Sequence, residues 1–357
     1  MRCRLFGVLG VLAVVSLRSA AQAPLTADAA PGALPALVQA NPAAAEQDAK
    51  DKNGNGNGNG DGKDDDKKEK EDKQDKPPRT LLEWAIGPKD EKPDSDEEDE
   101  KDTIVTDRPD FTEASSTVGK GRIQLESGYT YFRDRAQGAR LTSHSYPEML
   151  LRIGMFADWF ELRLGQNFST DVAVDQGVRT SVSGAQDTYL GCKIALTEQK
   201  GWLPETAVIL QMTVPTGARE FTAEEVLPGV NFLYSWDIIP DCISLAGSTQ
   251  ANRSRSVFDL PVDPSGLDFL EVGHSYLTVA QSLSIGYSLG ERLGAYTEAF
   301  ALFPSSSIDP AVGPEYYFDG GFTYLITDNF QIDIRAGVGL NDHATDFFTG
   351  AGFAIRR

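Results

Sequence analysis

The chain has 357 residues, of which 53 are acidic and 33 basic, and its formal net charge is −20. This acidity argues against a nucleic-acid-binding protein, because such a protein neutralises phosphates with a basic surface. Only 40% of the residues are hydrophobic, and no apolar run beyond the N-terminus reaches the roughly 18 residues of a membrane-spanning helix. A helical membrane protein is therefore excluded. A membrane β-barrel is not, because its strands alternate apolar and polar residues.

Residues 1–23 have the features of an export signal. Arg2 and Arg4 give a positive start, and an apolar run follows from Phe6 to Leu17. Small residues at Ala21 and Ala23 then form a cleavage site of the secretory type. We expect the mature protein to begin at residue 24.

Residues 24–103 have the composition of a disordered acidic linker. They contain 22 acidic and 12 basic residues, a net charge of −10, and too few apolar side chains to offset the entropy cost of folding. The start of a calcium-binding EF-hand at Asp51 lacks the required glutamate at its twelfth position, where Gly62 stands. Residues 80–87 are the exception in polarity. They predict a short capped helix that docks on the following domain or on a periplasmic partner.

Residues 104–357 predict twelve antiparallel strands. From Gly121 onward apolar and polar residues alternate with a period of two, and turn residues separate the runs. In the first run Ile123 and Leu125 share one face and Gln124 and Glu126 the other. We expect the same alternation in each of the remaining runs.

The connections between these runs favour a transmembrane barrel. Short turns are expected near residues 157–158, 239–240, 290–291 and 327–328, and long loops at 169–185, 215–228 and 252–272. Short turns at one end and long loops at the other, with an even number of strands, are typical of an outer-membrane barrel. A soluble β-sandwich also alternates but needs no such asymmetry. Aromatic residues near the strand ends match an interfacial girdle. The prediction is an all-β, 12-stranded antiparallel transmembrane β-barrel at residues 104–357 in the bacterial outer membrane, with the linker in the periplasm.

Several segments resemble a known family in the right order. They are Thr106-Asp-Arg-Pro-Asp-Phe-Thr-Glu113, the run from Gly121 to Tyr131, Asp187 to Lys193, Val214 to Gly217, and Asp319 to Asn341. Together they resemble the bacterial outer-membrane family labelled "putative MetA-pathway of phenol degradation". The resemblance implies a channel or transporter associated with aromatic degradation and brings no catalytic residues with it. Such barrels commonly end in an aromatic residue, whereas here Phe353 is followed by four further residues.

The inner face of the barrel is expected to carry many charges. These pore-lining candidates are Glu126, Glu148, Arg152, Glu161, Arg163, Asp187, Lys193, Asp237, Glu298, Asp319, Asp333 and Arg335. Eight are acidic and four basic, which favours a polar pore with a mild preference for cations. The alternative is a set of paired charges that fills the lumen, because charges in a confined space need partners.

Other function classes are less well supported. His144 and His274 have serine neighbours in sequence, but adjacent residues of a strand point to opposite faces, so we expect no enzyme. No cofactor and no metal site are expected. The expected partners are outer-membrane lipids and the barrel-assembly machinery, with a periplasmic or cell-wall partner for the linker and no nucleic acid.

The functional prediction is a passive outer-membrane channel for small solutes, with aromatic or apolar compounds as candidates. The long loops would fold over its mouth. The alternative is a structural barrel with a plugged lumen that anchors the acidic linker.

Overall fold

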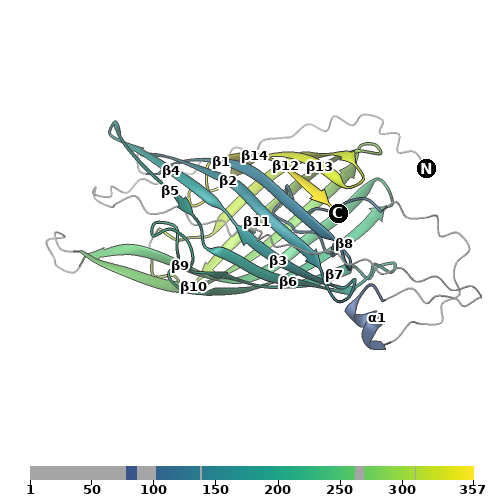
Figure 1. Ribbon diagram of the computed structural model, residues 1–357. Coiled ribbons are helices and arrows are strands. Elements are labelled where there is room, and N and C mark those ends of the chain that lie inside the picture. Colours follow the sequence, from purple (N-terminus) through teal and green to yellow (C-terminus); the bar gives the residue numbers. More distant parts are fainter. Residues whose placement is uncertain (1–77, 87–101, 137–138, 262–268, 310) are drawn as a thin grey trace, which may run out of the picture.

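The computed structural model describes residues 78–86, 102–136, 139–261, 269–309 and 311–357. They form one antiparallel sheet that closes on itself, because β1 pairs with both β2 and β14. The expected signal peptide and most of the expected linker lie outside these residues. Figure 1 shows the strands wrapped into a barrel.

The barrel is built from fourteen strand segments, and one short helix precedes them. The helix is α1 (Leu81–Ile86). The strand segments are β1 (Ile123–Ala136), β2 (Ala139–Gly154), β3 (Phe160–Gln166), β4 (Phe168–Asp175), β5 (Val178–Ala185), β6 (Thr188–Thr197), β7 (Glu205–Val214), β8 (Leu227–Ile239), β9 (Ile243–Pro261), β10 (Phe269–Ser288), β11 (Leu293–Ser305), β12 (Glu315–Thr327), β13 (Phe330–Gly339) and β14 (Phe347–Arg356).

These fourteen segments make twelve strands around the barrel, as predicted. Only Asn167 separates β3 from β4, and both pair with β2. Only Gln186 and Asp187 separate β5 from β6, which pair with β4 and β3 respectively. Each pair of segments is therefore one interrupted strand.

The two ends of the barrel differ, and we name them by their connections. The short-turn end carries the turns at residues 155–159, 198–204, 240–242, 289–292 and 328–329, together with the C-terminus. At the opposite, long-hairpin end the strands continue well past the barrel body, as the β4–β5 and β9–β10 hairpins in Figure 1 show.

Two of the three expected long loops are therefore mostly strand. Residues 169–175 and 178–185 belong to β4 and β5, and 252–261 and 269–272 belong to β9 and β10. The expectation of a loop was wrong there because these hairpins expose polar residues on both faces, which hides the alternation of a strand. The third segment is a true connection at residues 215–226.

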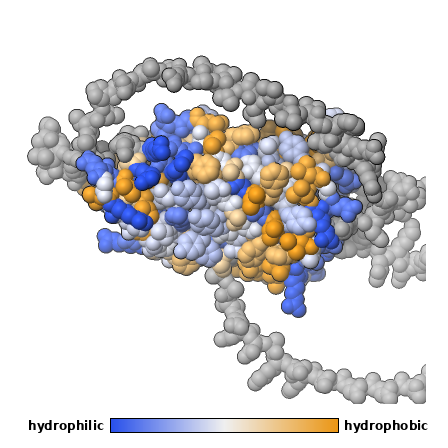
Figure 2. All heavy atoms as spheres, turned by 90° about the horizontal axis from the view of Figure 1, so that it is seen from above, coloured by the Kyte–Doolittle hydropathy of each residue, from blue (hydrophilic) through white to orange (hydrophobic). Residues whose placement is uncertain are grey.

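The outward face of the barrel is apolar. Along β13, Ile332, Ile334 and Val338 are exposed while Asp333 and Arg335 between them are buried. The same alternation exposes Phe318 and Phe322 on β12. Figure 2 shows hydrophobic residues on the visible wall, most densely toward the short-turn end, and strongly hydrophilic residues at both ends. This is the pattern of a wall that faces lipid and encloses a polar lumen.

Candidate functional site

The lumen contains a stretch of the chain's own sequence. Residues 102–120, which we call the luminal segment, precede β1 and thread into the barrel. The N–H of Ile104 donates to the carbonyl of Asp328 at the short-turn end (2.8 Å). The N–H of Lys120 donates to Asp158 at the same end (2.8 Å). Between these points the segment reaches inward, so it enters and leaves the lumen on the same side.

Asp107 is the most strongly paired residue of the luminal segment. Its carboxylate lies 2.5 Å from Arg163 Nη1, 2.9 Å from Lys193 Nζ and 3.4 Å from Arg152 Nε. Burial alone would raise the pKa of Asp107, but the charges of Arg152, Lys193 and Arg163 outweigh it and hold the pKa well below its usual range. Asp107 is thus an anion held at the centre of three wall cations.

Two of these cations, Arg152 and Arg163, lie next to each other on neighbouring strands. Their mutual repulsion explains why negative charge is needed between them. Arg152 on β2 lies directly opposite Arg163 on β3, and like charges in this position are destabilising. Glu161 bonds both of them, with 2.8 Å and 2.9 Å to Arg152 and 3.2 Å to Arg163. Glu113 of the luminal segment also pairs with Arg163. From the alternation alone, Glu148 and Glu161 are both candidate partners for Arg152 and Arg163; the structure pairs both arginines with Glu161, and Glu148 with Arg108.

Arg108 gives the luminal segment a second anchor of the opposite sign. Its Nη1 lies 2.8 Å from Glu148 and its Nη2 3.4 Å from Asp333. Although burial opposes it, the charges of Glu148 and Asp333 raise the pKa of Arg108 above its usual value. Successive residues of the segment thus match a basic and an acidic region of the wall.

Glu298 holds the innermost part of the segment. It accepts hydrogen bonds from the backbone N–H groups of Phe111 (2.6 Å) and Thr112 (2.8 Å), and from the Thr112 hydroxyl (2.5 Å). The Thr112 hydroxyl also lies 2.6 Å from that of Ser282. These bonds fix the turn of the segment against β10 and β11.

An aromatic cluster meets the tip of the segment. It consists of the inward-facing rings of Phe300, Tyr317 and Phe348, which are all buried. The ring of Phe111 stacks on Phe300, with 4.4 Å between centroids and 2° between planes. Phe300 in turn stacks on Tyr317 at 4.7 Å. At its tip the luminal segment therefore adds the ring of Phe111 to the end of an aromatic stack.

The structure brings most of the expected pore-lining residues together around the luminal segment. Ten of the twelve are buried inside the barrel: Glu126, Glu148, Arg152, Glu161, Arg163, Lys193, Glu298, Asp319, Asp333 and Arg335. Arg335 donates to the carbonyl of Pro109 (2.8 Å), and Glu126 accepts from the N–H of Asp107 (3.1 Å). That these side chains line an open pore stays a prediction, because here the luminal segment occupies their centre.

Two of the twelve lie elsewhere. Asp237 is exposed at the end of β8, where its backbone exchanges hydrogen bonds with Gln199. Asp187 sits in the break between β5 and β6, and its carboxylate accepts from the N–H groups of Gly217 (2.9 Å) and Ala223 (2.8 Å). Asp187 thus fastens the 215–226 connection to the barrel. Both positions fall at strand ends, where alternation no longer fixes the side of a residue.

Sequence reasoning did not place the residues of the luminal segment. Asp107, Arg108, Phe111 and Thr112 belong to the motif that carries the family resemblance, but no periodicity marks their position. Tyr317 was also missed as an inward-facing ring. The surplus of inner-face charges was the one signal that pointed to a binding partner inside the lumen.

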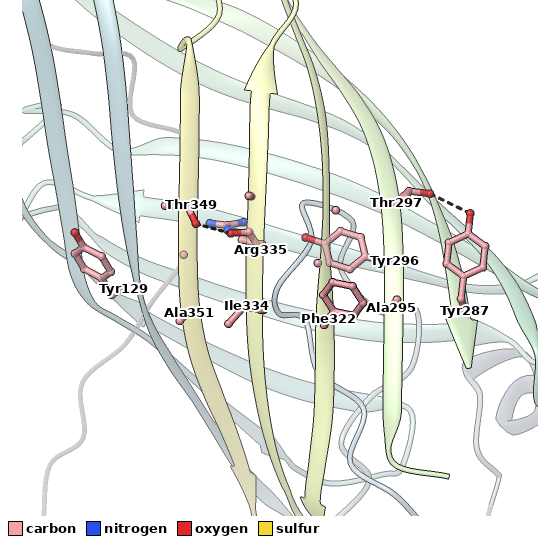
Figure 3. Close-up of a pocket in the computed structure, with 14 residues that line it drawn as sticks. Tyr129, Tyr287, Ala295, Tyr296, Thr297, Phe322, Ile334, Arg335, Thr349 and Ala351 are labelled. Atoms are coloured by element: carbon pink, nitrogen blue, oxygen red, sulfur yellow. Dashed lines mark hydrogen bonds between the residues drawn. The ribbon is translucent and has the colours of Figure 1, made fainter. Parts of the chain in front are cut away.

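A shallow cavity of about 690 Å³ lies in the wall formed by β10–β14 and β1. Small residues, including Ala295, Gly320 and Ala336, form its floor, and Tyr129, Tyr287 and Phe322 stand at its rim (Figure 3). Tyr287 and Thr297 join their hydroxyl groups across 3.2 Å, as the dashed line in Figure 3 shows. The cavity is lined by the lipid-facing Phe322 and Ile334 and also by the buried Tyr296 and Arg335.

The three histidines stay separate from any catalytic arrangement within the described residues. His144 Nδ1 lies 2.8 Å from the Tyr129 hydroxyl, and His274 Nε2 lies 2.9 Å from the carbonyl of Ser306. No group of three or more His, Cys, Asp or Glu side chains in the described part of the chain is arranged to hold a metal ion.

Comparison with known proteins gives a family and a fold. The family model described as "Putative MetA-pathway of phenol degradation" matches residues 106–356. The COG4313 outer-membrane channel from Pseudomonas putida F1 superimposes with a TM-score of 0.52 at 11% identity, over 68% of this chain and 98% of that one. The transport unit of the autotransporter AIDA-I from Escherichia coli gives 0.45 at 10% identity, over 66% and 89%. No curated protein matches the chain.

Proposed function

Because the chain belongs to the family described as "Putative MetA-pathway of phenol degradation" and folds as an outer-membrane barrel, we propose that it is a passive channel whose luminal segment is a movable plug. Solutes pass when residues 102–120 leave the lumen through the short-turn end, which faces the periplasm. The plug enters and leaves by that end, so it can withdraw without threading through the barrel.

The single observation that carries the proposal is the way the plug is held. Its contacts with the strands of the wall are made by the strands' side chains, which form ion pairs and hydrogen bonds with side-chain and backbone groups of the plug, as at Asp107, Arg108 and Thr112. No strand of the barrel pairs with it among the described residues. Withdrawal therefore breaks side-chain contacts but leaves the barrel's backbone ladder intact.

The aromatic cluster supports planar aromatic solutes as the preferred class. Phe111 occupies a place against the face of Phe300 that another flat ring could take, since stacked aromatic pairs gain about 0.5–1.5 kcal/mol beyond burial. A solute that competes with Phe111 for Phe300 would both bind and favour release of the plug. After release, Arg152 and Arg163 keep their wall partner Glu161 but lose Asp107, as does Lys193. The excess positive charge in this part of the lumen would then attract an aromatic carboxylate.

The test is uptake by liposomes that contain the refolded chain from residue 24. The solutes are 4-hydroxybenzoate and its saturated analogue 4-hydroxycyclohexanecarboxylate, which match in charge and hydroxyl but not in planarity. We expect faster uptake of the aromatic acid. Phe300→Ala should remove this preference. Phe303→Ala, on the lipid-facing side of the same strand, should keep it. Equal uptake of both acids by the unaltered chain would contradict the aromatic preference.

A specific observation also favours a second function, a closed structural barrel that anchors the acidic linker. Breaking a buried ion pair costs about 3–5 kcal/mol, and Asp107 alone takes part in three. If the folded chain shows no uptake and no conductance under any condition, and removal of residues 102–120 creates both, the plug is permanent and this second function holds.

A further inference from the structure

The short helix α1 is held in shape by its own capping groups. The Thr80 hydroxyl accepts from the N–H of Glu83 (3.2 Å), and the Glu83 carboxylate accepts from the N–H of Arg79 (3.1 Å). This pair resembles a capping box, except that Glu83 accepts from the residue before the N-cap Thr80. It matters because a six-residue helix is unstable in isolation, so capping and docking together must maintain it.

The helix docks on the outside of the barrel at the short-turn end (Figure 1). Leu81 and Ala85 face Leu196 of β6 across an apolar cavity of about 270 Å³. Leu196 points outward, because Lys193 and Ala195 of the same strand are buried in the lumen side. Arg79 Nε lies 3.5 Å from Glu198 beyond the end of β6. Of the two sites expected for residues 80–87, the barrel or a periplasmic partner, the structure places residues 80–86 against the barrel, and residue 87 lies outside the described residues.

Although it is docked, α1 leaves three large apolar side chains exposed. Leu82, Trp84 and Ile86 are exposed by 47%, 62% and 66%. Exposing such apolar side chains to water is unfavourable, and contiguous exposed apolar patches usually mark a binding or membrane surface. The two charged residues at the helix are already engaged elsewhere: Arg79 pairs with Glu198, and Glu83 caps the helix.

A row of neighbouring aromatic rings connects these exposed apolar side chains with the outer wall of the barrel. Trp84 lies 5.9 Å from Trp159, Trp159 lies 6.3 Å from Phe160, and Phe160 lies 5.7 Å from Phe156. Phe156, in the turn between β2 and β3, is 73% exposed. The chain of rings runs along the rim where the apolar wall ends. Tryptophan and other amphipathic rings are enriched at this level of membrane proteins.

We propose that Leu82, Trp84, Ile86 and Phe156 form a lipid-binding foot, seated in the headgroup and upper acyl region of the leaflet at the short-turn end. The occupant is phospholipid, since the foot is continuous with the wall that already faces lipid. It would fix the linker to the membrane surface immediately before the plug. The inference does not depend on whether the plug moves.

The test measures the depth of Trp84 in vesicles. The chain from residue 24 is refolded into phosphatidylcholine vesicles with Trp159, Trp202 and Trp236 replaced by Phe, so that Trp84 is the only tryptophan. Lipids brominated near the headgroup end of the acyl chain should quench most of its fluorescence. Lipids brominated near the chain end should quench it less. Adding anionic lipid or salt should change neither result, because the foot inserts by apolar contact.

A matched control places the reporter at the opposite end of the molecule. In a chain with Trp84→Phe as well, Val178→Trp puts a tryptophan at the exposed tip of the β4–β5 hairpin, and brominated lipids should leave it bright. Heat-modifiable migration on a gel confirms that each variant is folded. If Trp84 in the folded chain is as bright in brominated as in ordinary vesicles, the foot does not contact lipid. A soluble partner would then be the better occupant.

Discussion

The carboxylate of Asp107 and the guanidinium of Arg163 lie 2.5 Å apart inside the barrel, in an ion pair that joins the luminal segment to the wall. Arg163 belongs to β3, whereas Asp107 lies 16 residues before β1 begins. The pair therefore couples the state of the plug to the charges of the lumen.

Removing the charge of Asp107 should open the channel. Asp107→Asn leaves Arg152, Arg163 and Lys193 with less negative charge between them. Losing one partner of a buried pair costs about 3–5 kcal/mol, so the open-to-closed ratio should rise by roughly 10²–10⁴-fold. Single-channel recording in planar bilayers measures this ratio. Asp134→Asn, near the long-hairpin end of β1, is the matched control and should leave the ratio unchanged.

A double variant separates a charge effect from general damage. Lys193→Met in the Asp107→Asn background removes one of the unpaired cations, so it should restore part of the closed population. If the free-energy change of opening in the double variant equals the sum of the changes in the two single variants, Lys193 and Asp107 do not act as a pair.

A methyl group at Gly128 should weaken the second anchor of the plug, the ion pairs of Arg108. A Cβ at Gly128 would overlap the guanidinium of Arg108, whereas a Cβ at Gly290 would meet open space. Gly128→Ala should push Arg108 away from Glu148 and Asp333 and raise the open probability, with the barrel still folded. Gly290→Ala should change nothing. An unchanged open probability in folded Gly128→Ala would show that Arg108 is not an anchor.

Channel opening should increase with pH through Asp110 of the plug. Burial, and then the nearby Asp319, raise the pKa of Asp110 to about 8. The Asp110 side chain accepts from Ser284 (3.3 Å), and Glu298 and Asp319 also face it. A released plug would expose Asp110 to water, where its pKa is near 4.

The sign follows from proton binding. Between about pH 4 and pH 8 the plugged state holds a proton on Asp110 that the released state gives up, so rising pH favours release by at most about tenfold per unit. Above pH 8 this contribution is constant. Open probability recorded from pH 5 to pH 9 should rise and then level off. Asp110→Asn should flatten the rise, and Asp134→Asn should keep it.

The wall of the barrel could be predicted from sequence because alternation is a local signal. Ile332, Asp333 and Ile334 follow each other, and only one arrangement buries the charge and exposes its neighbours to lipid. The same reasoning placed Arg163 and Lys193 on the inner face. It was wrong for the hairpins of β4–β5 and β9–β10, where polar residues occupy both faces beyond the barrel body.

The plug could not be predicted in the same way, because its position depends on contacts far apart in sequence. Asp107 meets Lys193 and Arg108 meets Asp333, and no local pattern in residues 104–120 specifies either partner. The excess of inner-face charges indicated that the lumen needs counter-charges. It left open whether other strands or a separate segment would supply them.

A reversible cross-link between plug and wall tests the central claim most directly. The hydroxyl groups of Thr112 and Ser282 lie 2.6 Å apart, close enough for cysteines at both positions to form a disulfide. In a background with Cys192 and Cys242 replaced by Ser, Thr112→Cys with Ser282→Cys should give a silent barrel when oxidised. Reduction in the same bilayer should restore conductance to the level of the background chain. Equal conductance before and after reduction, with the cross-link verified, would contradict a movable plug.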